Sequence, residues 1–361
     1  MVPEDVAKRK LLRVALIASG RTVCEYSMFL QRLLVGLADE SVPVALVCPA
    51  LHNVASAFTG TAEVINHPVF DLPLMGRLNI RLLIERLGKF KPTVLHCLCE
   101  SHASLTAQLA RRLDLPYVLS VNSLQKRRSS LVVSSPHCVR IITPAKSIAD
   151  NLTGLFQDYA ELIEQINMGT FAAETSGCFS RPSRLATIVM AHSSGKIDEC
   201  ENVFSAVRHL LIDGYEFMMV VTAGGRAERQ LWKLLAALDL LSVVTLVPRL
   251  MPWRLVAPAG DIFIRPRPND AFEPLLLEAM SVGTAVAGCR GGVDDLIVEN
   301  QTAVVFNPDD ELSIMRTLQR LLDRREFAGQ LARSAREYVK ENYTVSGMVA
   351  AMFGVYGKVQ E

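Results

Sequence analysis

An α/β fold with two doubly wound domains is the architecture that this sequence predicts. Short apolar runs alternate with segments of helical periodicity, which is typical of parallel sheets built from strand–helix–strand units. The alternation occurs in two series, and residues 172–184 between them are small, polar or turn-forming. The 361 residues also exceed what one hydrophobic core usually organises. We therefore expect an N-terminal domain over 1–171, a linker over 172–184 and a C-terminal domain over 185–344.

The elements of both series follow from short apolar runs and from apolar residues at spacings of three and four. In the first series, which ends at 166–171, the strands are 13–19, 42–48, 93–98, 117–121 and 139–143, and the helices lie near 25–39, 77–89, 101–113 and 145–155. In the second series the strands are 185–191, 217–223, 243–247, 261–265, 284–288 and 303–307, followed by closing helices. In such sheets ligands bind outside the carboxyl ends of the strands.

Composition favours a cytoplasmic protein that binds no nucleic acid. The net charge is only +1, from 38 basic and 37 acidic residues, so no excess of positive charge points to nucleic acid. Eight scattered cysteines, several inside apolar runs, are expected to be reduced thiols rather than a disulfide framework. The N-terminal segment is a poor signal peptide, and no window reaches the roughly twenty apolar residues of a membrane span.

The most informative segment begins at Asp270 and reads DAFEPLLLEAMSVGTAVAGCRGG. Pro274 suits a first helical turn and Gly283 suits the left-handed residue beyond a helix end, so we expect a helix over about 274–282. Asp270 in the approach loop and Glu278 on the helix place two carboxylates beside a helix N-terminus. Backbone amides and the helix dipole favour phosphate there. A nucleotide with a ribose and a diphosphate matches this arrangement.

This segment resembles the donor site of the retaining glycosyltransferases of family 4, which have the GT-B fold. The family's acidic residue, seven others and glutamate correspond to Asp270 and Glu278, and Phe272 falls where the family has the phenylalanine of its G-F-G. The run LLLEAMSVGTAVAGCRGGVDDLIVENQTAVVFNPDD follows the family's usual pattern almost without gaps. The resemblance implies two Rossmann-like domains facing across a cleft. It also implies a last helix, over 345–361, that packs back on the first domain.

The resemblance implies a role for several residues of this segment. Glu278 would bind the ribose hydroxyls of a nucleotide sugar, and Asp270 would contact the donor sugar at the catalytic centre. The amides of about 273–275 would meet the diphosphate. The donor-binding set is completed by Phe272, Glu273, Pro274 and Leu275. No metal and no cofactor are expected, because the nucleotide sugar is itself the substrate.

Several positions depart from the family's pattern. The cationic G-R-x-x-x-x-K-G loop reads AHSSGKIDECEN here, with Ser193 in place of the arginine and Lys196 as a partial substitute for the cations. The Gly-Gly loop after the first strand is reduced to Gly20. Asn122 stands where the family often has a histidine near the reacting sugar. Asparagine hydrogen-bonds a sugar hydroxyl but does not shuttle a proton near neutral pH.

Glu273 replaces the second glycine of G-F-G, at the helix N-terminus that would receive phosphate. One interpretation is a carboxylate that points to solvent and complements the helix dipole. The other is a carboxylate that repels a diphosphate and marks a changed or lost donor. Arg265 and Arg267, at the end of a predicted strand, are further candidates for contact with the phosphates.

Candidates for the acceptor side lie in the first domain. The motif HCLCESH, which ends at His102, invites a zinc interpretation, but alternate strand residues point to opposite faces and no second pair with structural-zinc spacing occurs. Glu100, Ser101 or His102 at the strand's carboxyl end would instead line the acceptor side. Lys126 and Arg127, directly after another strand, would hold an anionic acceptor or a lipid headgroup, with peripheral contact to the inner face of the membrane.

The leading hypothesis is a retaining, metal-independent glycosyltransferase of polysaccharide or glycolipid biosynthesis. It would move a sugar from a nucleotide donor to a carbohydrate or lipid-linked acceptor in the cleft between the domains. The alternative is a catalytically inactive GT-B-like protein that acts as a binding or partner subunit. The combined loss of the Gly-Gly loop, the histidine and the arginine–lysine pair favours this alternative.

Overall fold

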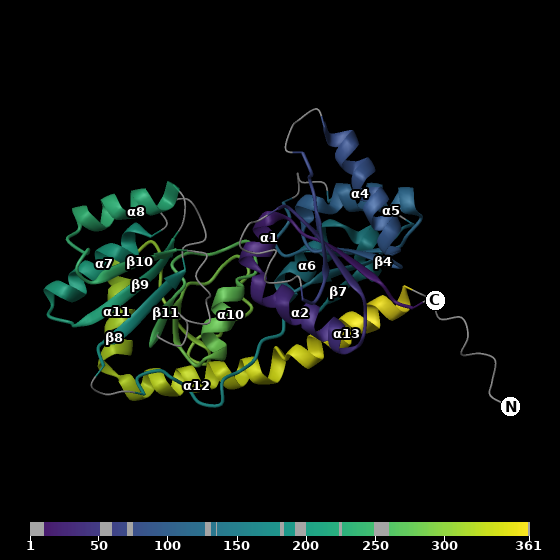
Figure 1. Cartoon of the computed structure of the whole chain (residues 1–361). Helices are drawn as coiled ribbons and strands as arrows, with labels where there is room; N and C mark the ends of the chain where they lie inside the picture. The colour runs from purple at the N-terminus through teal and green to yellow at the C-terminus, as the bar shows by residue number, and fades with distance from the viewer. Residues whose placement is uncertain are drawn as a thin grey trace. The chain divides into compact units, whose positions relative to one another are not determined.

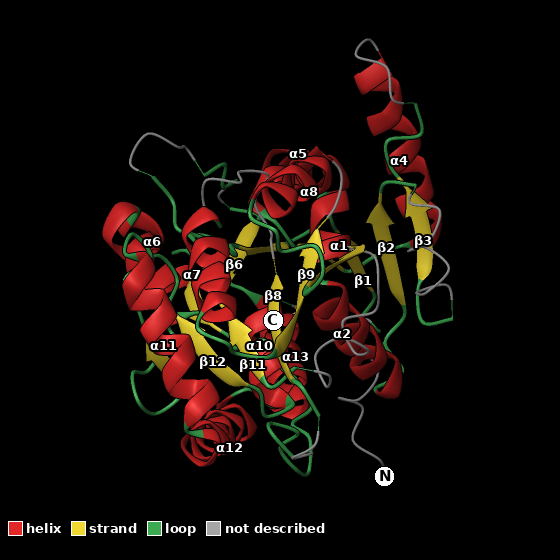
Figure 2. Cartoon of the chain, turned by 90° about the vertical axis from the view of Figure 1, so that its left-hand side faces the viewer, coloured by secondary structure: helices red, strands yellow, loops and turns green. Residues whose placement is uncertain are grey.

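The computed structural model describes residues 11–50, 60–70, 75–126, 131–134, 136–180, 184–191, 200–223, 226–248 and 260–359. The chain divides into two compact units (Figure 1). One unit consists of Met1–Gly169 and Thr344–Glu361, and the other is Thr170–Tyr343. Each has helices around a sheet of parallel strands (Figure 2), as the sequence predicts.

The first unit has a parallel sheet in the order β3-β2-β1-β4-β5-β6-β7 among its described residues. Its strands are β1 (Val14–Ile17), β2 (Val44–Cys48), β3 (Glu63–Asn66), β4 (Val94–Cys97), β5 (Tyr117–Ser120), β6 (Cys138–Thr143) and β7 (Ile163–Gln165). Its helices are α1 (Gly20–Glu25), α2 (Ser27–Asp39), α4 (Gly76–Phe90), η3 (Glu100–His102), α5 (Ala103–Leu113), α6 (Lys146–Leu155), η4 (Gln157–Leu162) and α13 (Val345–Lys358). The strand order reverses between β1 and β4, which is where doubly wound sheets bind ligands.

Burial explains which of these strands the sequence predicts. Strands β1, β2, β4 and β5 are buried at every residue, and strands covered on both faces read as continuous apolar runs. The edge strands β3 and β7 were not predicted. Their sequences, EVIN and IEQ, have partly exposed polar residues and contain no such run.

The second unit has a parallel sheet in the order β10-β9-β8-β11-β12-β13 among its described residues, and all six strands match the predicted runs. They are β8 (Ala186–Ala191), β9 (Phe217–Ala223), β10 (Val244–Pro248), β11 (Ile262–Ile264), β12 (Ala285–Gly288) and β13 (Ala303–Val305). The helices are α7 (Glu201–Ile212), α8 (Arg226–Ala237), α10 (Pro274–Ser281), α11 (Glu311–Asp323) and α12 (Arg325–Asn342). This order reverses between β8 and β11.

Helix α13 is part of the first unit, where it lies against α2 (Figure 1). A Cβ on Gly36 of α2 would lie 2.4 Å from a methyl carbon of Val349, so glycine permits this close approach. The fully buried His96 of β4 lies with Nδ1 2.6 Å from Tyr356 Oη of α13 and Nε2 2.8 Å from Ser120 Oγ of β5. Burial lowers the pKa of His96 to about 3, which keeps the imidazole neutral.

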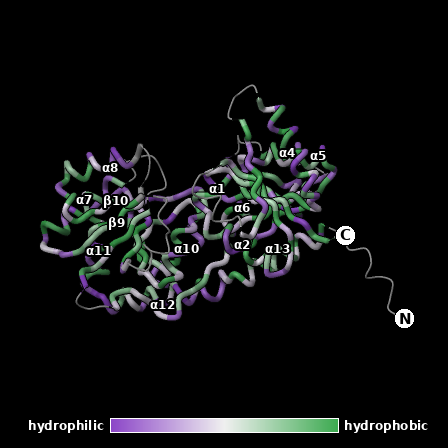
Figure 3. The backbone as a smooth tube through the Cα atoms, viewed as in Figure 1, coloured by the Kyte–Doolittle hydropathy of each residue, from purple (hydrophilic) through white to green (hydrophobic). Residues whose placement is uncertain are grey.

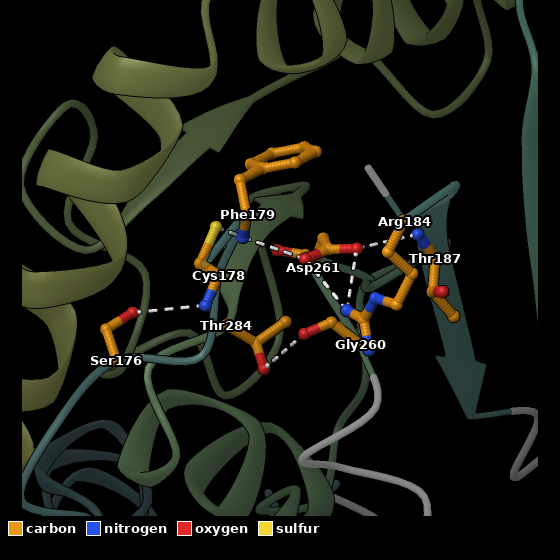
Figure 4. Close-up of polar contacts among 8 residues, drawn as sticks. All are labelled: Ser176, Cys178, Phe179, Arg184, Thr187, Gly260, Asp261 and Thr284. Atoms are coloured by element: carbon orange, nitrogen blue, oxygen red, sulfur yellow. Dashed lines mark hydrogen bonds and ion pairs between the residues drawn. The ribbon is translucent and has the colours of Figure 1, made fainter. Parts of the chain in front are cut away.

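Asp261, at the amino end of β11, binds the segment 172–184 that was predicted as a linker (Figure 4). Its carboxylate is 3% exposed and accepts the backbone N–H groups of Phe179 and Thr187, each at 2.8 Å. Arg184 Nη2 donates to both carboxylate oxygens at 3.1 Å. These bonds satisfy a buried charge, and they lie at the opposite end of the sheet from the carboxyl ends of its strands.

Hydrophobic residues concentrate along the sheets of both units (Figure 3). No disulfide joins any of the eight cysteines, all of which lie in the described ranges. Within those ranges, no helix combines the length and the hydropathy that crossing a membrane requires.

Candidate functional site

The predicted helix after Asp270 is α10, and its ends follow from two residues. Pro274 occupies the first turn, where its missing N–H is not needed. Gly283 has φ +73° just beyond the helix, and a Cβ there would lie 2.7 Å from Ser176. Ser176 Oγ donates to the carbonyl oxygen of Gly283 at 2.6 Å, which closes this end of the helix. The other end of α10, its amino end, comes after β11 in the chain, so it follows the carboxyl end of that strand, where we expect ligands to bind.

The Gly-Gly turn after β12 holds the Asp270 loop. Gly291 and Gly292 have φ values of +105° and +65°, which favour glycine. A Cβ on Gly292 would lie only 2.2 Å from the carbonyl oxygen of Asn269. The same carbonyl accepts the N–H of Val293 at 2.7 Å. Backbone contact thus positions the residue just before Asp270.

Arg265, directly after β11, is 1% exposed and joins the two loops. Its Nη1 donates to the carbonyl of Cys289 at 2.7 Å, and its Nη2 donates to those of Val293 at 2.9 Å and Gly291 at 3.4 Å. Its Nε donates to the carboxylate of Glu273. The guanidinium donors are used within the protein, so Arg265 does not have the expected role of a phosphate contact.

Glu273 is the N-cap residue of α10, and its side chain forms an ion pair with Arg265. The interpretation of a carboxylate pointing to solvent is therefore wrong, because the side chain is only 22% exposed and faces a buried cation. The interpretation of a carboxylate that repels a diphosphate is weakened, because the positive charge of Arg265 balances the negative charge of Glu273. The sequence did not reveal this pairing.

The two acidic positions of the motif differ in burial. Glu278 on α10 is 6% exposed, and Thr170 Oγ1 donates to its Oε1 at 3.1 Å. Asp270 is exposed in its loop. Phe272 between them is 2% exposed, so its ring lies in the packed interior. Leu275, in the first turn of α10, is half-buried.

Three predicted site residues, Ser193, Lys196 and Arg127, lie outside the described residues.

Arg267, a further candidate for contact with the phosphates, forms an ion pair with the exposed Asp309.

Gly20 is the first residue of α1, so only Ala18 and Ser19 separate this helix from β1. Ser19 caps that helix, its Oγ accepting the N–H of Thr22 at 3.1 Å. Ser19 is a good N-cap residue, so the helix starts immediately after β1. Arg21 in its first turn forms an exposed ion pair with Glu25 at 2.8 Å.

Asn122 connects the carboxyl ends of β4 and β5. Its Nδ2 donates to the carbonyl of Leu98 at 2.8 Å, and the residue is 7% exposed. Glu100 Oε1 accepts the N–H groups of Asn122 at 2.5 Å and Ser123 at 2.9 Å. Burial raises the pKa of Glu100, and these hydrogen bonds oppose the rise. The amide of Asn122 therefore has a structural role, which the predicted catalytic role did not include.

His102 lies beside a cavity of about 400 Å³ in the first unit, at the carboxyl ends of β3 and β4. His67, which follows β3, also lines the cavity, and we call it the imidazole pocket after these two residues. Sequence reasoning found His102 but missed His67, because the exposed edge strand before it carries no apolar signal. Lys126, the other described acceptor-side candidate, is exposed after β5.

Within the described residues, no three His, Cys, Asp or Glu side chains are grouped closely enough to hold a metal ion. This includes the HCLCESH motif, where Cys99 Sγ is 3.7 Å from His102 Nδ1.

Residues 181–338 match the family model described as glycosyl transferases group 1. The chain carries a group 1 glycosyltransferase domain. The group 1 domain includes Asp270, Arg265 and Glu278, and it occupies most of the second unit.

Two relatives share parts of this sequence. Sulfoquinovosyl transferase SQD2 of Arabidopsis thaliana is 37% identical over 83 residues, which are 22% of this chain and 16% of that protein. Glycogen synthase of Mycobacterium tuberculosis is 25% identical over 307 residues, which are 78% of this chain and 74% of that protein.

Solved structures match nearly the whole chain. HepE of Anabaena, in complex with UDP-glucose, has a TM-score of 0.80 at 11% identity over 96% of this chain and 100% of that chain. A glycosyltransferase from Rickettsia africae has a TM-score of 0.79 at 12% identity over 98% and 100%. At these identities the likeness shows the fold, and the predicted GT-B architecture is confirmed.

Proposed function

We propose that the chain is a retaining glycosyltransferase that transfers a sugar from a nucleotide-sugar donor to a carbohydrate or lipid-linked acceptor, without a metal or cofactor. The observation that carries the proposal is the convergence of the Asp270 loop, the Gly-Gly turn and the amino end of α10 on Arg265 within the group 1 domain. The complex of HepE with UDP-glucose supports a nucleotide sugar as the donor class.

Charge at the amino end of α10 is compatible with a diphosphate. Negative charge grows on the leaving diphosphate during transfer, so donors and a positive potential favour the reaction. The helix dipole supplies such a potential. Pro274 has no N–H, so within 273–275 only Glu273 and Leu275 offer backbone amides. Because Arg265 compensates the carboxylate of Glu273, this carboxylate does not present an unpaired charge to the phosphates.

Glu278 is proposed to bind the ribose. An ionised carboxylate only accepts hydrogen bonds, and two vicinal hydroxyls are donors that suit it. Its oxygen Oε1 already accepts one bond from Thr170, which orients the side chain. Asp270, exposed in the neighbouring loop, is proposed to contact the donor sugar.

A non-catalytic GT-B protein is the second candidate. Two observations favour it: the amide of Asn122 is used in joining strand ends, and the donors of Arg265 are used in joining loops. Neither residue is then available to stabilise the transition state of a transfer reaction.

Calorimetric titration with UDP-, GDP- and ADP-glucose tests the donor assignment. We expect one of the three to bind the intact chain and Glu278→Gln to weaken that binding at least tenfold, because hydrogen bonds to a charged group contribute about 1.5–3 kcal/mol. The control is Glu299→Gln, which changes an exposed carboxylate paired with Arg290 in the same domain.

Incubation of the bound donor with candidate acceptors, followed by NMR of the anomeric proton of the product, tests retention of configuration. No binding across the donor panel would contradict the enzyme proposal and favour the binding subunit. Binding that Glu278→Gln leaves unchanged would remove Glu278 from its role.

A cytoplasmic location with peripheral membrane contact is also part of the proposal. The exposed Lys126 would contribute to attraction toward anionic lipid. Lys126→Glu is expected to reduce co-sedimentation with phosphatidylglycerol vesicles, and equal co-sedimentation of both proteins would contradict this role.

A further inference from the structure

Cys97 and Cys99 belong to the HCLCESH motif, which the proposed function leaves unused. Cys97 ends β4, and Cys99 has the extended backbone angles φ −160° and ψ 150°. Residues two apart in an extended segment point to the same face, so both side chains lie on one side of the chain. Sγ of Cys97 donates to the carbonyl oxygen of Cys99 at 3.1 Å. The two thiols are neighbours, and neither is in a disulfide.

Polar groups surround the sulfur of Cys99. Ser101 Oγ donates to this sulfur at 3.3 Å, and Nδ1 of His102 lies 3.7 Å from it. Hydrogen bonding with the side chain of Cys97 lowers the pKa of Cys99, burial opposes this effect, and the contacts with Ser101 and His102 lower the pKa further. The thiolate is the nucleophilic form of cysteine. These contacts therefore favour a reactive sulfur at Cys99.

Cys97 has the opposite environment. It is 0% exposed, and burial raises its pKa well above the ordinary value for a thiol. Cys99 is 5% exposed, and the two side chains that contact its sulfur, those of Ser101 and His102, both line the imidazole pocket. A small oxidant that enters this pocket therefore meets Cys99 first. Cys97 is shielded from solvent and keeps its proton until Cys99 has reacted.

We propose that Cys97 and Cys99 form a peroxide-sensitive dithiol, which closes reversibly to a disulfide. The inference goes beyond the proposed function and does not require it. First, the thiolate of Cys99 attacks one oxygen of a hydroperoxide. An S–O bond forms, the O–O bond breaks and hydroxide or alkoxide leaves, which gives a sulfenic acid.

In the second step the sulfur of Cys97 attacks the oxidised sulfur of Cys99. An S–S bond forms, the S–O bond breaks, and the proton of Cys97 leaves with the hydroxyl group as water. Each sulfur atom loses one electron in the overall reaction, and the peroxide gains two.

Strain would make this disulfide easy to reduce. Each residue of an extended strand advances about 3.2–3.4 Å, so the Cα atoms of residues two apart are separated by about 6.4–6.8 Å. Disulfides usually join Cα atoms separated by at most about 6.8 Å, and a strained disulfide is more reducible. Strained disulfides are the labile, regulatory ones. We therefore expect a thiol reductant to reopen the bridge.

Closure of the bridge would act on Asn122. The carbonyl oxygen of Leu98, between the two cysteines, accepts a hydrogen bond from Nδ2 of Asn122 at 2.8 Å. Glu100, the next residue after the dithiol, accepts the N–H groups of Asn122 and Ser123. Drawing the two cysteines together shifts the backbone between them, which weakens these bonds. Oxidation would thereby loosen the connection between the carboxyl ends of β4 and β5.

Mass spectrometry of the intact chain after treatment with hydrogen peroxide tests the inference. Trypsin leaves both cysteines in one peptide, 90–111, because Lys91 precedes Pro92 and no Lys or Arg lies between that proline and Arg111. We expect this peptide to lose two hydrogen atoms and to regain them with dithiothreitol. Cys24, exposed on α1 and contained in the separate peptide 22–32, is the internal control and should be oxidised at least tenfold more slowly.

Two variants separate the steps. Cys97→Ala should stop the reaction at a sulfenic acid, which dimedone traps on Cys99. Ser101→Ala, at an exposed position, should slow the oxidation of Cys99 severalfold without disturbing the core, because it removes one donor to the sulfur. Ser104→Ala, at an exposed position of α5 that also lines the imidazole pocket, is the matched control and should leave the rate unchanged.

Hydrogen exchange measures the effect on the strand ends. The N–H groups of Asn122 and Ser123 should exchange at least tenfold faster in the oxidised protein, and dithiothreitol should restore the slow rate. Unchanged exchange in the oxidised protein would overturn the link between the dithiol and Asn122.

A peptide 90–111 that stays reduced, or oxidation of Cys24 as fast as that of the dithiol, would overturn the inference. Equal oxidation rates in Ser101→Ala and the unmodified chain would also contradict it, because the sulfur would then not depend on its donor. None of these outcomes involves a nucleotide sugar, so a UDP-glucose titration tests the proposed function separately.

Discussion

Replacing Glu273 by glycine would introduce the residue that stands at this position in the family 4 glycosyltransferases, which this segment resembles. We predict that it destabilises the second unit and does not improve donor binding. The reason is the ion pair: without Glu273, the guanidinium of Arg265 loses its only carboxylate partner among the described residues while staying 1% exposed. The substitution therefore measures how much the buried guanidinium of Arg265 depends on the carboxylate of Glu273 for stability.

The magnitude follows from the geometry around Arg265. Removing one partner of a buried ion pair typically costs about 3–5 kcal/mol. Two features reduce that cost here, since Glu273 is 22% exposed and Arg265 keeps three backbone carbonyl acceptors. Glycine adds the entropy of a more flexible unfolded chain, worth about 0.4–1 kcal/mol. We expect a loss of about 3 kcal/mol, which is a fall of about 6–12 °C in the melting temperature of a unit of this size.

Differential scanning calorimetry and urea unfolding of the intact chain measure this loss. Glu273→Gln separates charge from backbone effects, and Glu299→Gln should cost no more than about 1 kcal/mol because its partner Arg290 is exposed. A Glu273→Gly variant within about 0.5 kcal/mol of the unmodified chain would refute the reasoning. So would a variant that binds donor more tightly at equal stability.

Three further predictions concern the other fixed points of the fold. Gly292→Ala should cost about 2–4 kcal/mol in urea unfolding, because its Cβ would lie 2.2 Å from the carbonyl oxygen of Asn269 at φ +65°. Tyr356→Phe should lower the free energy of unfolding of the first unit by about 1–3 kcal/mol, because it removes the 2.6 Å hydrogen bond to the buried His96. The pKa of His96, about 3 in the folded state and about 6.5 when unfolded, implies that the unfolded chain binds the proton first as the pH falls. Stability of the first unit should therefore decline below pH 6.5, by up to about 1.4 kcal/mol per pH unit, and His96→Gln should flatten the profile measured by urea unfolding from pH 7 to 4.

Matched controls distinguish these effects from nonspecific damage. Gly88→Ala on α4 meets nothing within 4 Å and should stabilise the chain slightly, as alanine does within a helix. Tyr215→Phe removes a hydrogen bond to Asp323 at an exposed site and should change little. A Gly292→Ala variant as stable as Gly88→Ala, a Tyr356→Phe variant as stable as Tyr215→Phe, or an unchanged pH profile in His96→Gln would each contradict its prediction.

The sequence predicts the interior of the fold better than its edges. Parallel strands covered on both faces read as apolar runs, so β1 and β8 could be identified directly. Edge strands such as β3 carry no such signal, and His67 was missed together with the strand that precedes it. The helix α10 was predictable because Pro274 and Gly283 act through backbone geometry, which depends on single residues.

The candidate site was predicted in location but not in contacts. Arg265, Glu273 and Asn122 were each given an expected contact with ligand or solvent, and each instead bonds to the protein. Local sequence does not give the direction of a side chain across a turn. The partner of Arg265 is eight residues away and its carbonyl acceptors are more than twenty residues away, so the pairing follows only from the folded loops.

The position of Arg265 also constrains how this protein could have evolved. One guanidinium holds both the turn after β12 and the start of α10, so an ancestor with glycine at position 273 would have left an arginine at 265 without its counter-charge. Arginine at 265 and glutamate at 273 are therefore expected to depend on each other. Among relatives, arginine at 265 should occur with an acidic residue at 273, and glycine at 273 with a smaller or apolar residue at 265. Aligned sequences from many genomes would reveal this covariation or its absence.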